Sequence, residues 1–157
     1  MAARDPHADA TPPIRLRAST ADDLDLTYEI TEDAMRSYVE RTWGLWDPED
    51  QRRKHADAFT PATHRIVLVG DEAAGLVALE DLPDHLWLVK LYLRAPYRRR
   101  GIGSQLLRDV LAAARAQGKP VRLRVLRVNT GARRLYERHG FRVIDESAER
   151  FFMQSGD

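Results

Sequence analysis

Residues 95–107 read APYRRRGIGSQLL, an arginine-rich and glycine-containing stretch that leads into a predicted helix. Three consecutive arginines lead into Gly101 and Gly103, after which apolar residues recur at helical spacing. Backbone N–H groups at the start of a helix have no partner within the helix and carry the positive end of its dipole. Glycines let an anion approach such a backbone closely, and arginines add charge and forked donors. The stretch indicates an anion-binding loop, with an ordinary solvated turn as the simpler alternative.

Two common phosphate-binding patterns do not fit this loop. The third glycine and the following acidic residue of a dinucleotide-binding fingerprint are missing. A P-loop is excluded as well, because no Gly-Lys-Ser or Gly-Lys-Thr is present. The loop needs a second feature before a ligand can be assigned to it.

That second feature lies at residues 129–141, NTGARRLYERHGF. This segment resembles the Asn-x-x-Ala-x-x-Leu-Tyr…Gly-Phe segment of the GCN5-related N-acetyltransferase (GNAT) family. Residues 98–103, RRRGIG, are similar to the Gln/Arg-x-x-Gly-x-Gly/Ala signature of the same family. One predicted helix and one predicted strand separate the two motifs, as in that family. The resemblance implies an acetyltransferase that uses acetyl-CoA.

The pattern of apolar residues predicts a single α/β (α+β) domain with the element order β-α-α-β-β-β-α-β-α-β-β. Short turns between the central strands predict an antiparallel meander. The resemblance implies a mixed, mostly antiparallel sheet of about seven strands with helices on both faces. The strands are expected near residues 14–17, 65–69, 74–80, 86–93, 121–125, 141–144 and 151–153, and the helices near residues 20–41, 48–59, 102–117 and 129–139.

Composition narrows the functional classes. The 157 residues suit one domain, expected at residues 14–157 after a flexible tail at residues 1–13. The absence of cysteine excludes disulfides, thiolate metal sites and a cysteine nucleophile. A net charge of +1 argues against electrostatic nucleic-acid binding, and no apolar run is long enough for a membrane helix. With no signal-peptide pattern at the start, we expect a cytoplasmic protein. We expect no metal. A homodimer that pairs through exposed terminal strands is possible.

The resemblance also implies a cofactor site, residue by residue. Backbone amides of residues 99–104 are expected to hold the diphosphate of acetyl-CoA, with arginine side chains as countercharge. Main-chain groups of residues 91–93 are expected to pair with the pantetheine arm. Asn129 is expected to hydrogen-bond that arm, although capping the following helix is an equal alternative. The expected cofactor-binding residues are Leu91, Tyr92, Leu93, Arg98, Arg99, Arg100, Gly101, Ile102, Gly103, Ser104, Asn129 and Tyr136.

Tyr136 is the first catalytic candidate. Acetyl transfer to an amine releases the thiolate of CoA, and thiols have a pKa near 8.5. A phenol at hydrogen-bond distance can protonate or stabilise that sulfur. The alternative is a core tyrosine on an amphipathic helix.

The second catalytic candidate is Glu80, as the base that takes a proton from the incoming ammonium. Alkyl ammonium groups have a pKa near 10.4, so the proton must leave before attack. Asp81, His85 and Glu32 are further candidates. Some family members carry a glutamate on the strand before the glycine loop, but Trp87 occupies that position here. Deprotonation through water is therefore an equal alternative.

Trp43 and Trp46 are expected to contact the amine acceptor. They lie in a loop of the segment where this family usually builds its acceptor site, near Glu32, Glu40 and Asp47. Aromatic rings beside acids suit a cationic amine. A purely structural role in the core is the alternative, and it is favoured for Tyr38.

Two other functions compete with the enzyme. A non-catalytic acyl-CoA-binding module of the same fold, serving regulation or scaffolding, is compatible with the missing base. A nucleic-acid surface along the arginines is the weaker rival, because exposed aromatic residues do not alternate with them.

Overall fold

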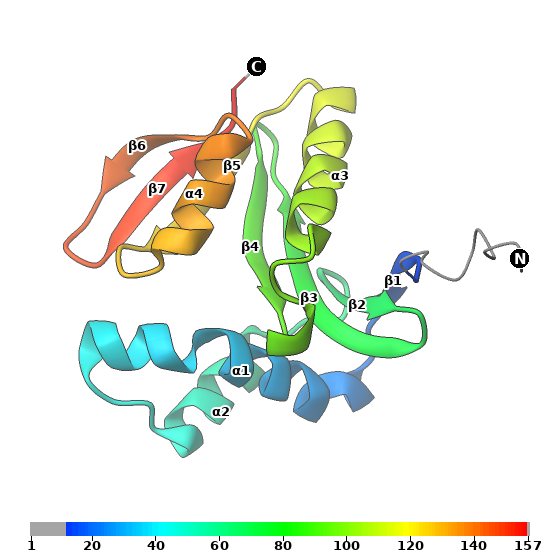
Figure 1. The fold of residues 1–157 in the computed structure, drawn as a ribbon, viewed down its shortest axis with the longest axis vertical. Helices are drawn as coiled ribbons and strands as arrows, with labels where there is room; N and C mark the ends of the chain where they lie inside the picture. The colour runs from blue at the N-terminus through cyan, green and yellow to red at the C-terminus, as the bar shows by residue number, and fades with distance from the viewer. Residues whose placement is uncertain (1–11, 157) are drawn as a thin grey trace, which may run out of the picture.

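The computed structural model describes residues 12–156, and its elements follow the predicted order (Figure 1). The strands are β1 (Ile14–Ala18), β2 (His64–Val69), β3 (Glu72–Asp81), β4 (Leu86–Leu93), β5 (Val121–Leu126), β6 (Arg142–Glu146) and β7 (Arg150–Gln154). The helices are α1 (Leu24–Trp43), α2 (Pro48–Ala58), α3 (Ile102–Ala116) and α4 (Thr130–Arg138), with short 3₁₀ turns at Ala21–Asp23 and Ala95–Tyr97. The expected tail, residues 1–13, lies outside the described residues except for its last two.

The strands form one seven-stranded sheet in the order β1-β2-β3-β4-β5-β7-β6. Every neighbouring pair in it is antiparallel except β4 and β5, which run parallel. The predicted mixed, mostly antiparallel sheet is therefore confirmed. The last strand, β7, inserts between β5 and β6, so the two edges of the sheet are β1 and β6.

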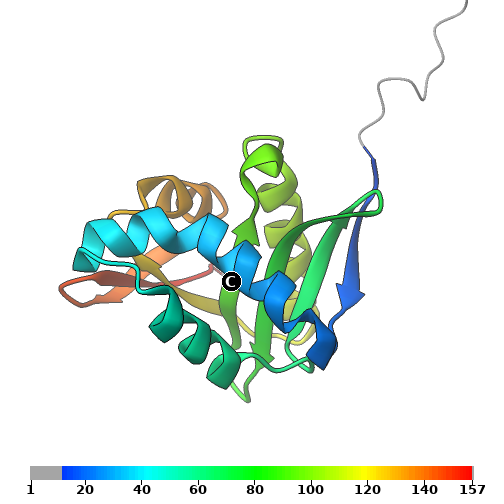
Figure 2. The ribbon, with the colours of Figure 1, turned by 90° about the horizontal axis from the view of Figure 1, so that it is seen from below.

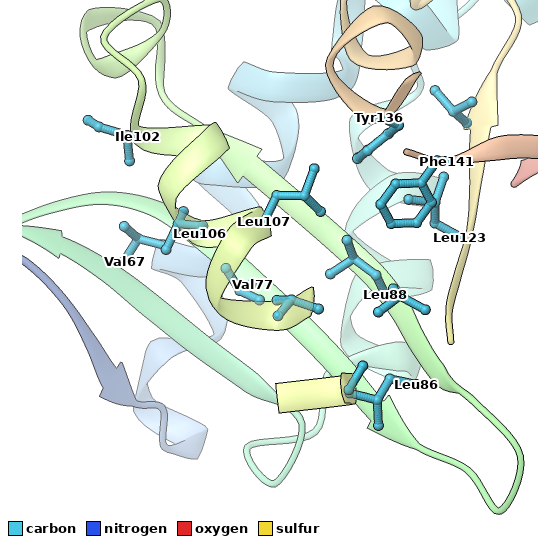
Figure 3. Close-up of a cluster of buried hydrophobic side chains, with 14 of the residues drawn as sticks. Val67, Val77, Leu86, Leu88, Ile102, Leu106, Leu107, Leu123, Tyr136 and Phe141 are labelled. Atoms are coloured by element: carbon cyan, nitrogen blue, oxygen red, sulfur yellow. The ribbon is translucent and has the colours of Figure 1, made fainter. Parts of the chain in front are cut away.

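Helices cover both faces of the sheet, as predicted. Helices α1 and α2 lie on one face, and α3 and α4 lie on the other (Figure 2). The apolar residues of α3 recur at helical spacing and are buried against the sheet, among them Leu106 and Leu107 (Figure 3). Burying a leucine side chain contributes about 1.5–3 kcal/mol, so this face anchors the start of α3 firmly. The loop before α3 is thus held in a fixed position over the sheet.

The face under α1 and α2 has a mixed core. Ile30, Ile66 and Leu76 are fully buried there. Two histidines, His55 and His64, are buried as well. His64 Nδ1 donates to the Thr60 carbonyl at 2.9 Å, whereas its buried Nε2 has no hydrogen-bond partner among residues 12–156.

The parallel strands β4 and β5 separate after a short contact. They pair only from Leu86 to Leu88, opposite Val121 to Leu123. Ala78 on β3 pairs with Lys90, while Leu79 pairs with Leu88, so Val89 is an extra residue on β4. Such a bulge bends and twists a strand. The bulge lies where β4 leaves β5, and it opens the sheet toward the loop before α3.

Candidate functional site

A cleft of about 210 Å³ occupies the opening between β4 and β5. Its lining passes through the sheet, because α1 contributes residues from one face while α3 and α4 contribute residues from the other. The lining residues are Ala34, Met35, Tyr38, Leu88, Val89, Leu91, Tyr92, Leu93, Arg98, Gly103, Arg124, Val125, Asn129, Ala132, Leu135 and Tyr136. A ligand entering from the α3 side can therefore meet one entering from the α1 side.

The loop before α3 presents a row of free backbone donors. Arg98 N donates to the Ala95 carbonyl, and Gln105 N donates to the Gly101 carbonyl. The backbone N–H groups of the six residues between them, 99–104, have no acceptor among the described residues. Six consecutive free donors at the positive end of a helix dipole make an anion-binding site.

The two glycines of this loop have different reasons to be there, backbone conformation for Gly101 and space in the cleft for Gly103. Gly101 has φ of +80°, the left-handed region that favours glycine, and a Cβ there would meet no atom within 4 Å. Arg99 is also left-handed, with φ of +62°, which is uncommon for a residue with a Cβ. Gly103 is different, because it lines the cleft and a Cβ there would point between Leu93 and Leu135.

The three arginines of the loop differ in their surroundings. Arg98 is occupied: its Nε donates to the Leu93 carbonyl at 2.9 Å, and its guanidinium also donates to the Asp33 carbonyl of α1. This side chain ties the loop to β4 and α1. Arg99 and Arg100 are exposed, and the guanidinium of Arg100 lies 5.8 Å from the ring centre of Tyr97. Arg99 and Arg100 are therefore the arginines available as countercharge.

The edge of β4 that faces β5 is where the pantetheine arm was expected. Beyond Leu88, that edge has no partner strand in β5, so the main-chain groups of residues 89–93 that point away from β3 have no partner in the sheet. Leu91 and Leu93 pack their side chains against the core under α3. The Leu93 carbonyl is an exception among these groups, because it accepts from Arg98.

Asn129 and Tyr136 reach the same cleft from α4. The Asn129 side-chain oxygen accepts from Ala132 N at 3.2 Å, so the residue caps α4. Its amide nitrogen makes no hydrogen bond among the described residues, although the residue lines the cleft. One side chain is therefore able to cap the helix and bind a ligand.

The Tyr136 side chain is buried, with its ring 5.6 Å from that of Phe141, and Figure 3 shows the two side by side. Its hydroxyl makes no hydrogen bond within residues 12–156. Burial raises the pKa of Tyr136 well above its usual 10, and the nearby Tyr92 adds to the rise. The phenol is thus protonated at neutral pH and free to donate into the cleft.

The acid candidates lie away from the cleft. Glu80 is exposed and pairs with Trp87 in the half of β4 that still contacts β5. Asp81 accepts from Lys119 Nζ at 2.7 Å, and His85 Nδ1 lies 2.7 Å from Asp84. No aspartate or glutamate is among the residues that line the cleft.

The Glu32 carboxylate is held by hydrogen bonds from two neighbouring side chains. It accepts from the Tyr28 hydroxyl at 2.6 Å and from Trp46 Nε1 at 3.1 Å. The hydrogen bond from Tyr28 holds the pKa of Glu32 below its usual value. Both partners are buried, Tyr28 on α1 itself and Trp46 in the loop after it, so this carboxylate ties that loop to the helix.

The two tryptophans separate in the structure. Trp46 is only 4% exposed and packs on Tyr28, so it does not reach the cleft. Trp43 ends α1 and is 49% exposed, with the Arg150 guanidinium 5.2 Å from its ring centre. Tyr38, expected in the core, lines the cleft.

The sequence analysis missed two basic residues in this region, Arg124 and Lys90. Arg124 lines the cleft directly. Lys90 does not line the cleft but is buried next to α2, with its Nζ 3.5 Å from His55 Nδ1. Burial lowers the pKa of Lys90 to about 8. The alternation Val-Arg-Leu-Arg-Val at residues 121–125 was the available signal for Arg124, because it places both arginines opposite the apolar side. Lys90 had no such signal.

Two features of other protein classes are absent from the described part of the chain. Across residues 12–156, no helix has both the length and the apolar character needed to cross a membrane. The same residues hold no group of three or more histidine, cysteine, aspartate or glutamate side chains that fits a metal ion.

Comparisons with known proteins agree with this geometry. PaiA N-acetyltransferase from Thermoplasma acidophilum, solved in complex with coenzyme A, has a TM-score of 0.74 and 19% identity, over 92% of this chain and 99% of that one. An acetyltransferase from Thermus thermophilus has a TM-score of 0.71 and 19% identity, over 92% and 97% of the two chains. At these identities the likeness shows the fold.

A search of curated protein sequences found no match. The sequence model of the Acetyltransferase (GNAT) family, however, matches residues 27–141, which include the arginine–glycine loop, the separated strands and Tyr136. This range is well over half of the chain, so the protein belongs to the GNAT family of acetyltransferases.

Proposed function

We propose that the protein is an N-acetyltransferase that transfers the acetyl group of acetyl-CoA to the amine of a small molecule or peptide. The observation that carries this proposal is the row of free N–H groups at residues 99–104, at the mouth of a cleft between separated strands. A diphosphate supplies several acceptor oxygens with negative charge, which is what such a row binds. Membership of the GNAT family, and a similar fold solved with coenzyme A, support the same ligand.

The cleft supports one direction of binding. With the diphosphate at the loop before α3, the pantetheine arm passes Gly103 and lies along the free edge of β4. Asn129 donates to it from the opposite wall. The thioester then reaches the bulge at Val89, where the cleft opens toward α1. The amine approaches from the α1 side, past Tyr38.

The reaction proceeds by direct attack in a complex of both substrates. The neutral amine nitrogen bonds to the thioester carbon, and the carbon–sulfur bond then breaks to release the thiolate of CoA. Tyr136 acts as the acid, donating its hydroxyl proton to the sulfur as negative charge develops. The acylated nitrogen then loses its extra proton to water, and the Tyr136 oxygen regains a proton from water. The raised pKa of Tyr136 keeps that proton in place until the sulfur needs it.

The proton of the ammonium leaves through water in this scheme. The cleft has no carboxylate in its lining, and Glu80 lies outside it on the exposed end of β3. We propose that water in the open cleft carries the proton away, with Glu80 as the weaker alternative. If Glu80 is the base, Glu80→Gln lowers kcat and shifts its dependence on pH; if water is the carrier, kcat is unchanged.

The missing carboxylate also supports a second function, a non-catalytic acyl-CoA-binding module. Two measurements separate the functions. Calorimetry with acetyl-CoA tests binding, which both functions require. Release of free thiol from acetyl-CoA across a panel of amines tests transfer. Thiol release that depends on an added amine supports the enzyme, whereas binding without any release supports the module. Absence of binding at micromolar concentration contradicts both.

A homodimer is still a proposal. The exposed edge strands β1 and β6, with Leu16 and Ile144 each nearly half exposed, are the surfaces that would pair. Sedimentation equilibrium gives the oligomeric state directly.

A further inference from the structure

Arg124 lines the cleft, and Arg150 lies beside it on the neighbouring strand β7, outside the cleft lining itself. Paired residues of an antiparallel ladder point to the same face, and Arg124 pairs with Phe152 while Arg150 pairs with Leu126. The alternate residues of both strands, including Leu123 and Met153, are buried in the core on the α3 side. Arg124 and Arg150 therefore lie on the opposite face of the sheet, the face toward α1.

Arg124 pairs with Phe152, two residues after Arg150, so the two arginines are diagonal neighbours on one face of the ladder, a spacing that long side chains can bridge. Burial lowers the pKa of Arg150, and the positive charge of Arg124 lowers it further. Both arginines also act on Tyr92, a residue that lines the cleft: burial raises the pKa of its phenol to about 12, and the two guanidiniums oppose that rise. These three side chains thus form one cluster beside the cleft. We call Arg124 and Arg150 the arginine pair.

The arginine pair has no carboxylate partner. Within residues 12–156, no aspartate or glutamate oxygen lies within 4.0 Å of either guanidinium. Glu149 is near enough to raise the pKa of Arg150, but it does not form an ion pair with it. Elsewhere in the same region, Arg127 pairs with Glu146 and Arg133 pairs with Glu137. Two like charges left together without an anion at a cleft indicate that a ligand supplies the anion.

The surroundings of the arginine pair set the size and character of that ligand. The Trp43 ring lies against Arg150, and Tyr38 and Met35 of α1 line the adjoining wall. The cleft volume of about 210 Å³ must also hold the end of the pantetheine arm. The remaining space suits a small molecule with some apolar surface.

We propose that the acceptor is a small amine that also carries a carboxylate, such as a free amino acid, and that Arg124 and Arg150 bind this carboxylate. This inference rests on the proposed acetyltransferase function. A guanidinium holds a carboxylate through two parallel hydrogen bonds, which fixes the direction of the rest of the molecule. With its carboxylate held on the α1 side, the acceptor presents its amine to the thioester at the bulge of β4. Trp43 and Tyr38 contact the hydrocarbon part.

The test compares each proteinogenic amino acid with its own amide as the acceptor, together with β-alanine, γ-aminobutyrate and a peptide that begins with the preferred amino acid. Thiol release gives kcat and KM for each. We expect at least one acid to exceed its amide in kcat/KM by about tenfold or more, since hydrogen bonds to charged groups are strong. The free amino acid should also exceed the peptide.

Variants then assign the effect to the arginine pair. Arg124→Gln and Arg150→Gln should raise KM for the acid by about tenfold each and leave KM for the amide unchanged. Arg115→Gln, on the exposed end of α3, is the matched control and should change neither constant. A second readout does not need turnover: in the presence of CoA, the N-acetylated acid should bind more tightly than its N-acetylated amide, and only in the protein with both arginines.

The outcomes distinguish a failure of this inference from a failure of the proposed acetyltransferase function. If acetyl-CoA does not bind, or no amine releases thiol, the proposed function fails and the inference fails with it. If amides or peptides are acetylated as well as the free acids, the acetyltransferase stands and the inference is overturned. The inference is equally overturned if both arginine variants keep the discrimination between acid and amide.

Discussion

Replacing Gly103 by alanine should stabilise the protein and weaken its binding of acetyl-CoA at the same time. Gly103 is the second residue of α3, with an ordinary helical φ. A Cβ there would lie 3.5 Å from Leu135 Cδ2 and 3.8 Å from Leu93 Cδ1, both normal van der Waals contacts. The protein therefore accepts the methyl group without strain. Alanine also favours the helix over glycine by up to about 1 kcal/mol.

The same methyl group projects into the cleft between its two walls, where the pantetheine arm must pass the loop. An extra methyl group in a filled space costs about 1–3 kcal/mol, which corresponds to about a fivefold to 150-fold loss of affinity. The larger side chain of Gly103→Val should abolish measurable binding. Thermal unfolding gives the stability of each variant, and titration calorimetry gives its affinity for acetyl-CoA.

Gly131→Ala is the matched control. Gly131 is likewise the second residue of its helix, α4, and a Cβ there would meet no atom within 4 Å. It does not line the cleft. This variant should gain stability and keep its affinity for acetyl-CoA. If Gly103→Ala folds normally and binds acetyl-CoA within about twofold of the wild type, the assigned path of the cofactor is wrong.

Three further predictions concern Tyr136 and the buried basic groups. Tyr136→Phe should lower kcat by about a hundredfold with little change in acetyl-CoA affinity; lost affinity with unchanged kcat contradicts the acid role. Burial and the charge of Lys90 lower the pKa values of His55 and His64 from 6.5 to about 4. Because the unfolded chain gains these protons first, the free energy of unfolding should fall from pH 6.5 to 4, by up to about 3 kcal/mol per histidine; imidazole pKa values near 6.5 by NMR refute this. Lys90→Met removes a buried charge and should raise the free energy of unfolding at pH 7 by about 1–3 kcal/mol in urea denaturation; an unchanged or lower value contradicts the cost of that charge.

Local signals in the sequence predicted most of the elements. Asp47 stands directly before the helix expected near residues 48–59, and its side chain accepts from Glu49 N and Asp50 N. Asn129 caps α4, one of the two roles expected for it, and Gly101 precedes the first residue of α3. Each of these signals depends on residues within one turn of the chain, so the sequence carries it directly.

Features that depend on distant contacts were not predictable in this way. Nothing near β7 indicates that it inserts between β5 and β6. Lys90 appears in an ordinary strand pattern, and its burial against His55 depends on the bulge at Val89, which has no local signal. Trp43 and Trp46 are separated by two residues, yet the left-handed turn at Gly44 sends only Trp46 into the core.

The candidate site also combines features that depend on local residues with features that depend on distant contacts. The loop before α3 could be identified from its residues because backbone donors and glycines act locally. The proposed acceptor side could not be identified in this way, since Arg124 and Arg150 come together only through the pairing of β5 with β7. No aspartate or glutamate lines the cleft, whereas Arg124 does, and this difference changes the acceptor chemistry that we infer.

A crystal structure of the acetyl-CoA complex tests the central claim most directly. The account predicts that diphosphate oxygens accept hydrogen bonds from the backbone N–H groups of residues 99–104, with the thioester at the opening between β4 and β5. A diphosphate bound anywhere else on the protein, with those six donors left to solvent, would contradict it.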